Sequence, residues 1–108
     1  MNANDTTYAA RKMEQFVSIS EMKQGMAVSA RLLVSQKELN PRKNPPNSHF
    51  LVLSFMDKTG TIIGKVWERA EEWYAKTDPG DVLEVQAHVK SFNNNLELSI
   101  VSMRKVTL

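Results

Sequence analysis

Residues 50–68 decide the fold, and they read FLVLSFMDKTGTIIGKVWE. Apolar residues alternate with other residues on both sides of Asp57-Lys58-Thr59-Gly60, and alternation with a period of two is the signal of a β-strand. Asp supplies a side-chain acceptor and Gly tolerates unusual backbone angles, so these four residues predict a tight turn. The stretch therefore predicts a β-hairpin.

The two faces of this hairpin differ in character, because successive side chains of a strand point to opposite sides of the sheet. One face is apolar enough to form a core, and it holds Leu51, Leu53, Phe55, Ile62, Gly64 and Val66. The other face holds Phe50, Val52, Ser54, Met56, Ile63, Lys65 and Trp67. This second face should meet water, yet it carries two aromatic rings and a lysine. The mismatch predicts a binding surface.

The rest of the chain adds three strands, one helix and two loops. A long alternating segment, 28–39, predicts a strand that bends to serve both parts of a sheet or to close a barrel. Prolines and asparagines make 40–48 a loop, and 69–77 predicts a short helix. Two further strands, 82–90 and 96–101, flank an Asn-rich hairpin loop. We expect residues 1–15 to be a flexible or partly helical arm and residues 16–108 to be one domain.

This element order is typical of one all-β architecture. Five strands with one short helix between the third and the fourth predict a five-stranded Greek-key barrel, the OB-fold. In that fold, the face of strands two and three and the loops after strands one and four bind oligonucleotides or oligosaccharides. The helix plugs one end of the barrel, which predicts a core position for Trp73.

The composition excludes several classes of protein. The chain has 108 residues, no cysteine and a formal net charge of +2, so a disulfide framework and thiolate metal sites are ruled out and net charge alone does not indicate nucleic acid. No apolar run is long enough to span a membrane, and we expect a cytoplasmic protein. His49 and His88 lack partners at ligand spacing, so we expect no metal and no cofactor. No catalytic motif appears, which predicts a binding protein and not an enzyme.

The candidate site combines stacking and charge. An exposed indole offers a stacking platform for a nucleobase, and the nearby cations can reach phosphates. The predicted nucleic-acid-binding residues are Trp67, Lys65, Phe50, Val52, Arg31, Lys37, Arg42, Lys43, Lys90 and Phe92. A one-residue slip in strand register would instead put Trp67 in the core.

The chain from Phe16 to about Val106 also resembles the N-terminal OB domain of the YhaM-like 3′-to-5′ exoribonucleases. The resemblance lies in Met22-Lys23-Gln24-Gly25, Lys37-Glu38-Leu39, Asp57-Lys58-Thr59-Gly60, Lys65-Val66-Trp67 and Pro79-Gly80-Asp81-Val82. In that family a His-Asp phosphohydrolase domain, which this chain does not contain, follows the OB domain. The resemblance implies substrate handling, with RNA more probable than DNA as ligand, and not catalysis.

Three hypotheses about function follow. The first is a module that binds single-stranded RNA or DNA with little sequence preference. The second is a protein-interaction domain, in which the apolar members of the same face contact a second copy of the chain or a nuclease or replication partner. The third is the substrate-binding part of a larger exoribonuclease. An oligosaccharide ligand is compatible with the fold, but the basic loops favour a polyanion.

Overall fold

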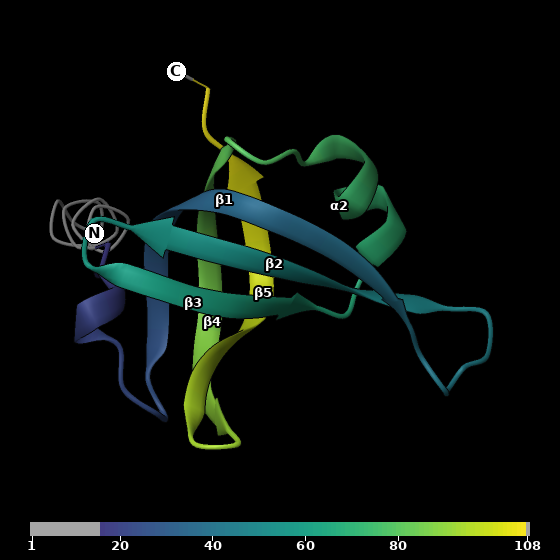
Figure 1. The fold of residues 1–108 in the computed structure, drawn as a ribbon, viewed down its shortest axis with the longest axis horizontal. Coiled ribbons are helices and arrows are strands. Elements are labelled where there is room, and N and C mark those ends of the chain that lie inside the picture. The colour runs from purple at the N-terminus through teal and green to yellow at the C-terminus, as the bar shows by residue number, and fades with distance from the viewer. Residues whose placement is uncertain (1–15, 108) are drawn as a thin grey trace, which may run out of the picture.

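In the computed structural model, which describes residues 16–107, five strands close into one barrel in the order β1-β2-β3-β5-β4 (Figure 1). The elements along the chain are η1 (Ile19–Glu21), β1 (Ala27–Pro41), β2 (His49–Asp57), β3 (Gly60–Val66), α2 (Ala70–Lys76), β4 (Val82–Phe92) and β5 (Asn95–Lys105). Neighbouring strands are antiparallel except β3 and β5, which run parallel. The predicted OB-fold, with its helix between strands three and four, is confirmed. The predicted arm, 1–15, lies outside the described residues.

Strand β1 is shared between the two halves of the barrel. Its first part, 27–33, pairs with β4, and its second part, 33–41, pairs with β2. Between Val34 and Gln36 the register with β2 shifts, because Ser35 is an extra residue without a partner on β2. Such a bulge bends a strand and reverses the alternation beyond it. The bend predicted from the length of this strand is therefore present.

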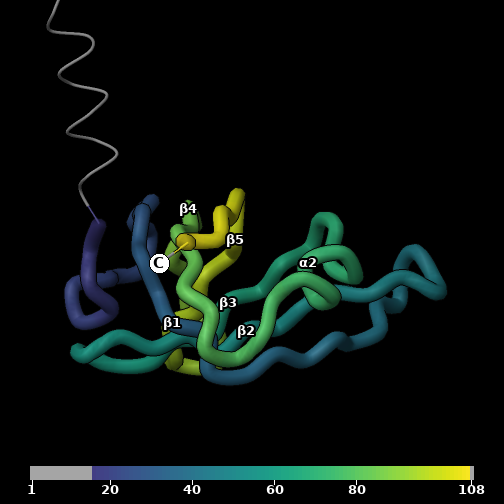
Figure 2. Tube along the Cα trace, turned by 90° about the horizontal axis from the view of Figure 1, so that it is seen from above, coloured from purple at the N-terminus to yellow at the C-terminus, as the bar shows by residue number. Residues whose placement is uncertain are grey.

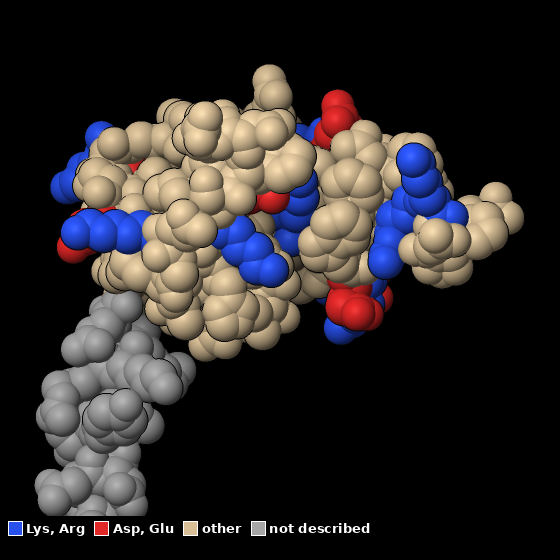
Figure 3. All heavy atoms as spheres, turned by 90° about the horizontal axis from the view of Figure 1, so that it is seen from below, with Lys and Arg blue, Asp and Glu red and all other residues tan. Residues whose placement is uncertain are grey.

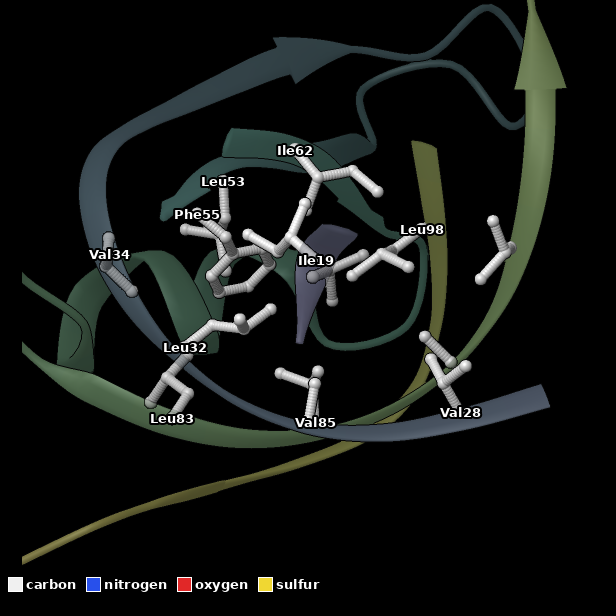
Figure 4. Packing of buried hydrophobic residues seen from close by; sticks show 14 of the residues in the cluster. Ile19, Val28, Leu32, Val34, Leu53, Phe55, Ile62, Leu83, Val85 and Leu98 are labelled. Carbon is white, nitrogen blue, oxygen red and sulfur yellow. The ribbon is translucent and has the colours of Figure 1, made fainter. Parts of the chain in front are cut away.

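The barrel interior contains the predicted core face of the hairpin. Leu51, Leu53 and Phe55 from β2 are fully buried, and Ile62 and Val66 from β3 are nearly so. Strand register pairs Leu51 with Val66 and Phe55 with Ile62, so both strands present the same face inward. Figure 4 shows Leu53, Phe55 and Ile62 converging in the barrel with side chains from β1, β4 and β5. The sequence analysis therefore predicted the inward-facing residues of this hairpin correctly.

Two short helices lie toward opposite ends of the hairpin (Figures 1 and 2). Helix η1 sends Ile19 into the core beside the β2–β3 turn. Helix α2 packs against β1 and β2 through buried Ala70, and Trp73 lies half-buried against the core. The predicted packing role of Trp73 is therefore met in part. No helix within residues 16–107 is long and apolar enough to cross a membrane.

Candidate nucleic-acid interface

The outer side of the central hairpin forms a continuous surface, which we call the β2–β3 face. It consists of Phe50, Val52, Ser54 and Met56 from β2, Ile63 and Lys65 from β3, and Trp67 just after β3. The Trp67 side chain is 41% exposed and that of Ile63 is 37% exposed. Trp67 is therefore a surface residue, as the alternation predicted, and not part of the core.

The two predicted aromatic residues stack on each other. The ring centroids of Phe50 and Trp67 are 4.6 Å apart and the ring planes are 23° from parallel. The Arg42 guanidinium, from the β1–β2 loop, lies 5.2 Å from the indole centroid, and its Nη1 donates to the Trp67 carbonyl oxygen at 3.4 Å. One end of the face is thus a layered group of a planar cation and two aromatic rings, which we call the aromatic stack.

Lys65 lies next to the aromatic stack, two residues before Trp67 on the same side of the hairpin, and it is not free. Its Nζ lies 3.2 Å from a carboxylate oxygen of Glu97 on β5 and 4.7 Å from the ring centroid of Phe92. Val52 lies directly across from Lys65 on β2 and adds an apolar side chain to the face. Lys65 therefore lies beside both Phe92 and Val52, but it already has a negative partner.

Two loops border the face. The β1–β2 loop carries Arg42 and Lys43, and Figure 3 shows a basic group on this projecting part of the molecule. At the β4–β5 hairpin, Asn93 and Asn94 both have positive φ (53° and 65°), which Asn tolerates better than most residues. Phe92 beside this turn is 56% exposed. Lys90 lies on the outer side of β4, opposite Glu97.

Arg31, predicted to extend the basic edge, lies elsewhere. It is in the part of β1 that pairs with β4, where its guanidinium donates to Glu84 at 2.6 Å. Hydrogen bonds from Arg104, and then from Arg31, hold the pKa of the Glu84 carboxyl below its ordinary value. The Arg31 guanidinium also lies 4.6 Å from the Phe16 ring centroid. Arg31 therefore belongs to an ion-pair cluster on the β1–β4–β5 side.

The sequence analysis also predicted the wrong side of the sheet for Lys37. The bulge at Ser35 reverses the alternation in the part of β1 that follows, and Lys37 lies in that part. Lys37 lies opposite the buried Leu53, so its side chain leaves the sheet on the side of α2. Its Nζ donates to the Tyr74 carbonyl oxygen at 2.8 Å and lies 3.5 Å from Asp78. Its ammonium holds α2 and does not extend a free basic edge.

A shallow groove of about 440 Å³ lies where β1 bends over the β2–β3 face. Its lining residues are Ser35, Gln36, Lys37, Glu38, Val52, Ser54, Ile63 and Pro79. Gln36, Glu38 and Glu97 were missed by the sequence analysis. The alternation that was used for β5 could have put Glu97 on the outer face, but no local signal in the sequence pairs Glu97 with Lys65.

Metal binding has no support from the geometry of the described part. Within residues 16–107, no three His, Asp or Glu side chains cluster to hold an ion. His49 instead has its Nδ1 2.9 Å from Glu71 of α2, and this hydrogen bond holds the pKa of Glu71 below its usual value. His88 lies on β4 opposite Ser99 of β5.

A closed five-stranded barrel with a helix between β3 and β4 and a basic, aromatic outer face defines a nucleic-acid-binding barrel of the OB class. Residues 33–106 match the family model described as the OB-fold nucleic acid binding domain, and this chain belongs to that family. The match makes this part of the chain a binding domain and not a catalytic one. No curated protein matches the chain.

Several solved structures share the fold. The second OB-fold domain of replication protein A from Methanococcus maripaludis is 24% identical, with a TM-score of 0.68 over 85% of this chain and 95% of that one. A replication protein A heterotrimer bound to ssDNA is 22% identical, with a TM-score of 0.59 over 80% and 61%. A murine DNA-binding protein bound to dsDNA is 17% identical, with a TM-score of 0.63 over 100% and 55%. At these identities the likeness shows the fold alone.

Proposed function

We propose that the β2–β3 face binds single-stranded nucleic acid with little sequence preference. The observation that carries the proposal is the aromatic stack, because Phe50 and Trp67 present flat rings with Arg42 over the indole and Lys65 in the next row of the same surface. Bases of a single strand are free to leave their own stack, and every base has a face that can lie on a ring. The neighbour bound to ssDNA supports this choice of ligand.

Arg42 makes this stack adjustable. Its guanidinium lies over the indole at the position where a base would stack. An exposed cation–π contact contributes about 0.5–1 kcal/mol, whereas a base stacked on an aromatic side chain contributes about 1–3 kcal/mol. Replacement of the guanidinium by a base is therefore favourable, and it frees Arg42 to contact a phosphate beside Lys43.

The choice between RNA and DNA is a separate prediction. The resemblance to the exoribonuclease OB domains favours RNA, whereas the replication protein A heterotrimer bound to ssDNA favours single-stranded DNA. A protein distinguishes the two through the 2′-hydroxyl group. The same titration can therefore compare both ligands.

The experiment is fluorescence anisotropy of labelled single-stranded RNA, single-stranded DNA and duplex DNA, with wild type and with Trp67→Ala. We expect both single strands to bind more tightly than the duplex. We expect Trp67→Ala to weaken binding roughly tenfold or more, because one stacking contact is lost. Tyr74→Ala is the matched control, since Tyr74 is an exposed aromatic residue on α2, away from the face, and it should bind as wild type does.

Salt dependence tests the phosphate contacts. Each phosphate contact to a single strand contributes about −0.7 to the slope of log affinity against log salt, so contacts from Arg42, Lys43, Lys65 and Lys90 predict a slope of roughly −2 to −3. A slope near zero would contradict phosphate contacts. Equal binding of duplex and single strands, unchanged in Trp67→Ala, would contradict the proposal.

A protein interface is the second candidate for this surface. The observation in its favour is the exposure of Ile63 and Trp67 around the apolar Val52, since exposed apolar patches mark interaction sites. Light scattering over a range of concentrations tests it. A mass that rises with concentration in wild type but not in Trp67→Ala, together with no binding of any oligonucleotide, would favour self-association.

A further inference from the structure

One carboxylate stands between the cations of the β2–β3 face. Glu97 on β5 is paired with Lys65 at 3.2 Å, and the two side chains are only 20% and 23% exposed. Strand register puts Glu97 opposite Lys90 on β4 and beside Ile63 on β3. The negative charge therefore lies between two of the cations that would contact phosphates.

The Lys65 ammonium has a neighbour on each of two sides. The carboxylate holds it on one side, and the Phe92 ring lies 4.7 Å away. A phosphate that binds Lys65 must compete with this carboxylate, because both are anions that accept hydrogen bonds from the same group. Lys90 differs, since within residues 16–107 no carboxylate lies within ion-pair distance of it.

We propose that Glu97 is a built-in competitor of the phosphate backbone, which holds Lys65 in the free protein and releases it when nucleic acid binds. This inference rests on the proposed function of the face. When a phosphate takes Lys65, the Glu97 carboxylate loses its ion pair, because the two anions compete for one ammonium group. Glu97 weakens the binding of any ligand that contacts Lys65 alone. Tight binding therefore requires a nucleic-acid strand that also occupies the aromatic stack.

A purely structural role is the rival explanation. Strands β3 and β5 pair at only three positions, Ile63 with Glu97, Gly64 with Leu98 and Lys65 with Ser99. The Lys65–Glu97 ion pair lies on this seam and could serve to hold it closed. The two roles predict opposite changes in affinity for nucleic acid when the pair is removed. If Glu97 competes with phosphate, its removal raises the affinity. If the ion pair holds the seam closed, its removal destabilises the face and lowers the affinity.

The test uses Glu97→Gln, Lys65→Gln and the double variant, each titrated against a labelled single-stranded DNA and melted separately. Glutamine keeps the shape of Glu97 and removes its charge. We expect Glu97→Gln to bind single-stranded DNA roughly threefold to tenfold more tightly, with a salt slope close to that of wild type, because Lys65 contacts one phosphate in both complexes. In the Lys65→Gln background the same change should have little effect, because the competed cation is absent.

Glu38→Gln is the matched control for charge in general. Glu38 is an exposed carboxylate that lines the groove on the same face, and within residues 16–107 it has no cation within ion-pair distance. The inference would be overturned if Glu38→Gln raised the affinity as much as Glu97→Gln does. It would also be overturned if Glu97→Gln still raised the affinity in the Lys65→Gln background. Weaker binding with a lowered melting temperature in Glu97→Gln would show a clamp instead. In both cases salt-sensitive binding by wild type would leave the proposed function intact, whereas no binding by wild type or any variant would refute both.

Discussion

Asp57 shows how one side chain connects three segments at the β2–β3 turn. Its Oδ1 accepts hydrogen bonds from the Thr59 backbone N–H at 2.7 Å, the Thr59 hydroxyl at 2.5 Å and the Gly60 N–H at 3.1 Å. Its Oδ2 accepts from the Ile19 N–H at 2.9 Å, which ties η1 to the hairpin. Burial alone would raise the pKa of the Asp57 carboxyl, but the hydrogen bonds from the Thr59 side chain and then from the backbone outweigh it and hold the pKa below its ordinary value.

Asp57→Asn should therefore destabilise the fold in a pH-dependent way. The folded pKa lies below the unfolded value, so the stabilising effect is present above the unfolded pKa of about 4 and is lost as pH falls through the folded pKa. We expect a loss of about 1–2 kcal/mol at pH 7, since hydrogen bonds to a charged acceptor are replaced by weaker ones. Urea unfolding of wild type and variant from pH 7 to pH 3 measures it. A difference that stays constant over this range would contradict the role of the charge.

The β2–β3 hairpin depends on the glycine in its inward face. Gly64 lies opposite Leu53, and a Cβ atom added there would lie 2.6 Å from Cε2 of Phe55 and 3.3 Å from Cδ1 of Ile100. The Phe55 ring is fully buried, so any movement of the ring would disturb the core packing around it. The close approach of this ring to the β3 backbone therefore requires glycine at 64.

Gly64→Ala should destabilise the barrel by about 1–3 kcal/mol, the usual effect of overpacking a core. Gly60→Ala is the control, because a Cβ atom there would lie 3.5 Å from Cγ2 of Ile19, an ordinary contact. Urea midpoints of both variants test this. Equal midpoints for the two variants would show that the barrel adapts around Phe55.

The same strands show where sequence analysis succeeds and where it fails. Alternation and the Asp-Gly turn predict the hairpin and its inward face correctly, because both signals are local. The bulge at Ser35 has no such signal, so the alternation was extended through it and Lys37 was assigned to the wrong side. Glu97 was missed because its contact with Lys65 depends on the parallel pairing of β3 with β5, which are far apart in the sequence.

At the scale of the molecule, many of the charged side chains within residues 16–107 form ion pairs. Arg31 and Arg104 share Glu84, Lys105 pairs with Asp81, and Lys65 pairs with Glu97. Figure 3 accordingly shows basic side chains spread over the surface with acidic ones between them, apart from the group on the projecting β1–β2 loop. A net charge of +2 with this distribution provides little long-range attraction. Affinity for nucleic acid must therefore come from contacts on the β2–β3 face.

The most direct measurement is an ¹H–¹⁵N NMR titration of the full chain with a short single-stranded DNA. The chain has two tryptophans, Trp67 on the face and Trp73 against the core, so their indole N–H signals report two different places. We predict that the Trp67 indole signal and the amides around Phe50, Val52 and Lys65 shift with added DNA, while the Trp73 indole signal stays in place. Shifts confined to the side of Arg31, Glu84 and Arg104, with Trp67 unmoved, would contradict binding at the β2–β3 face.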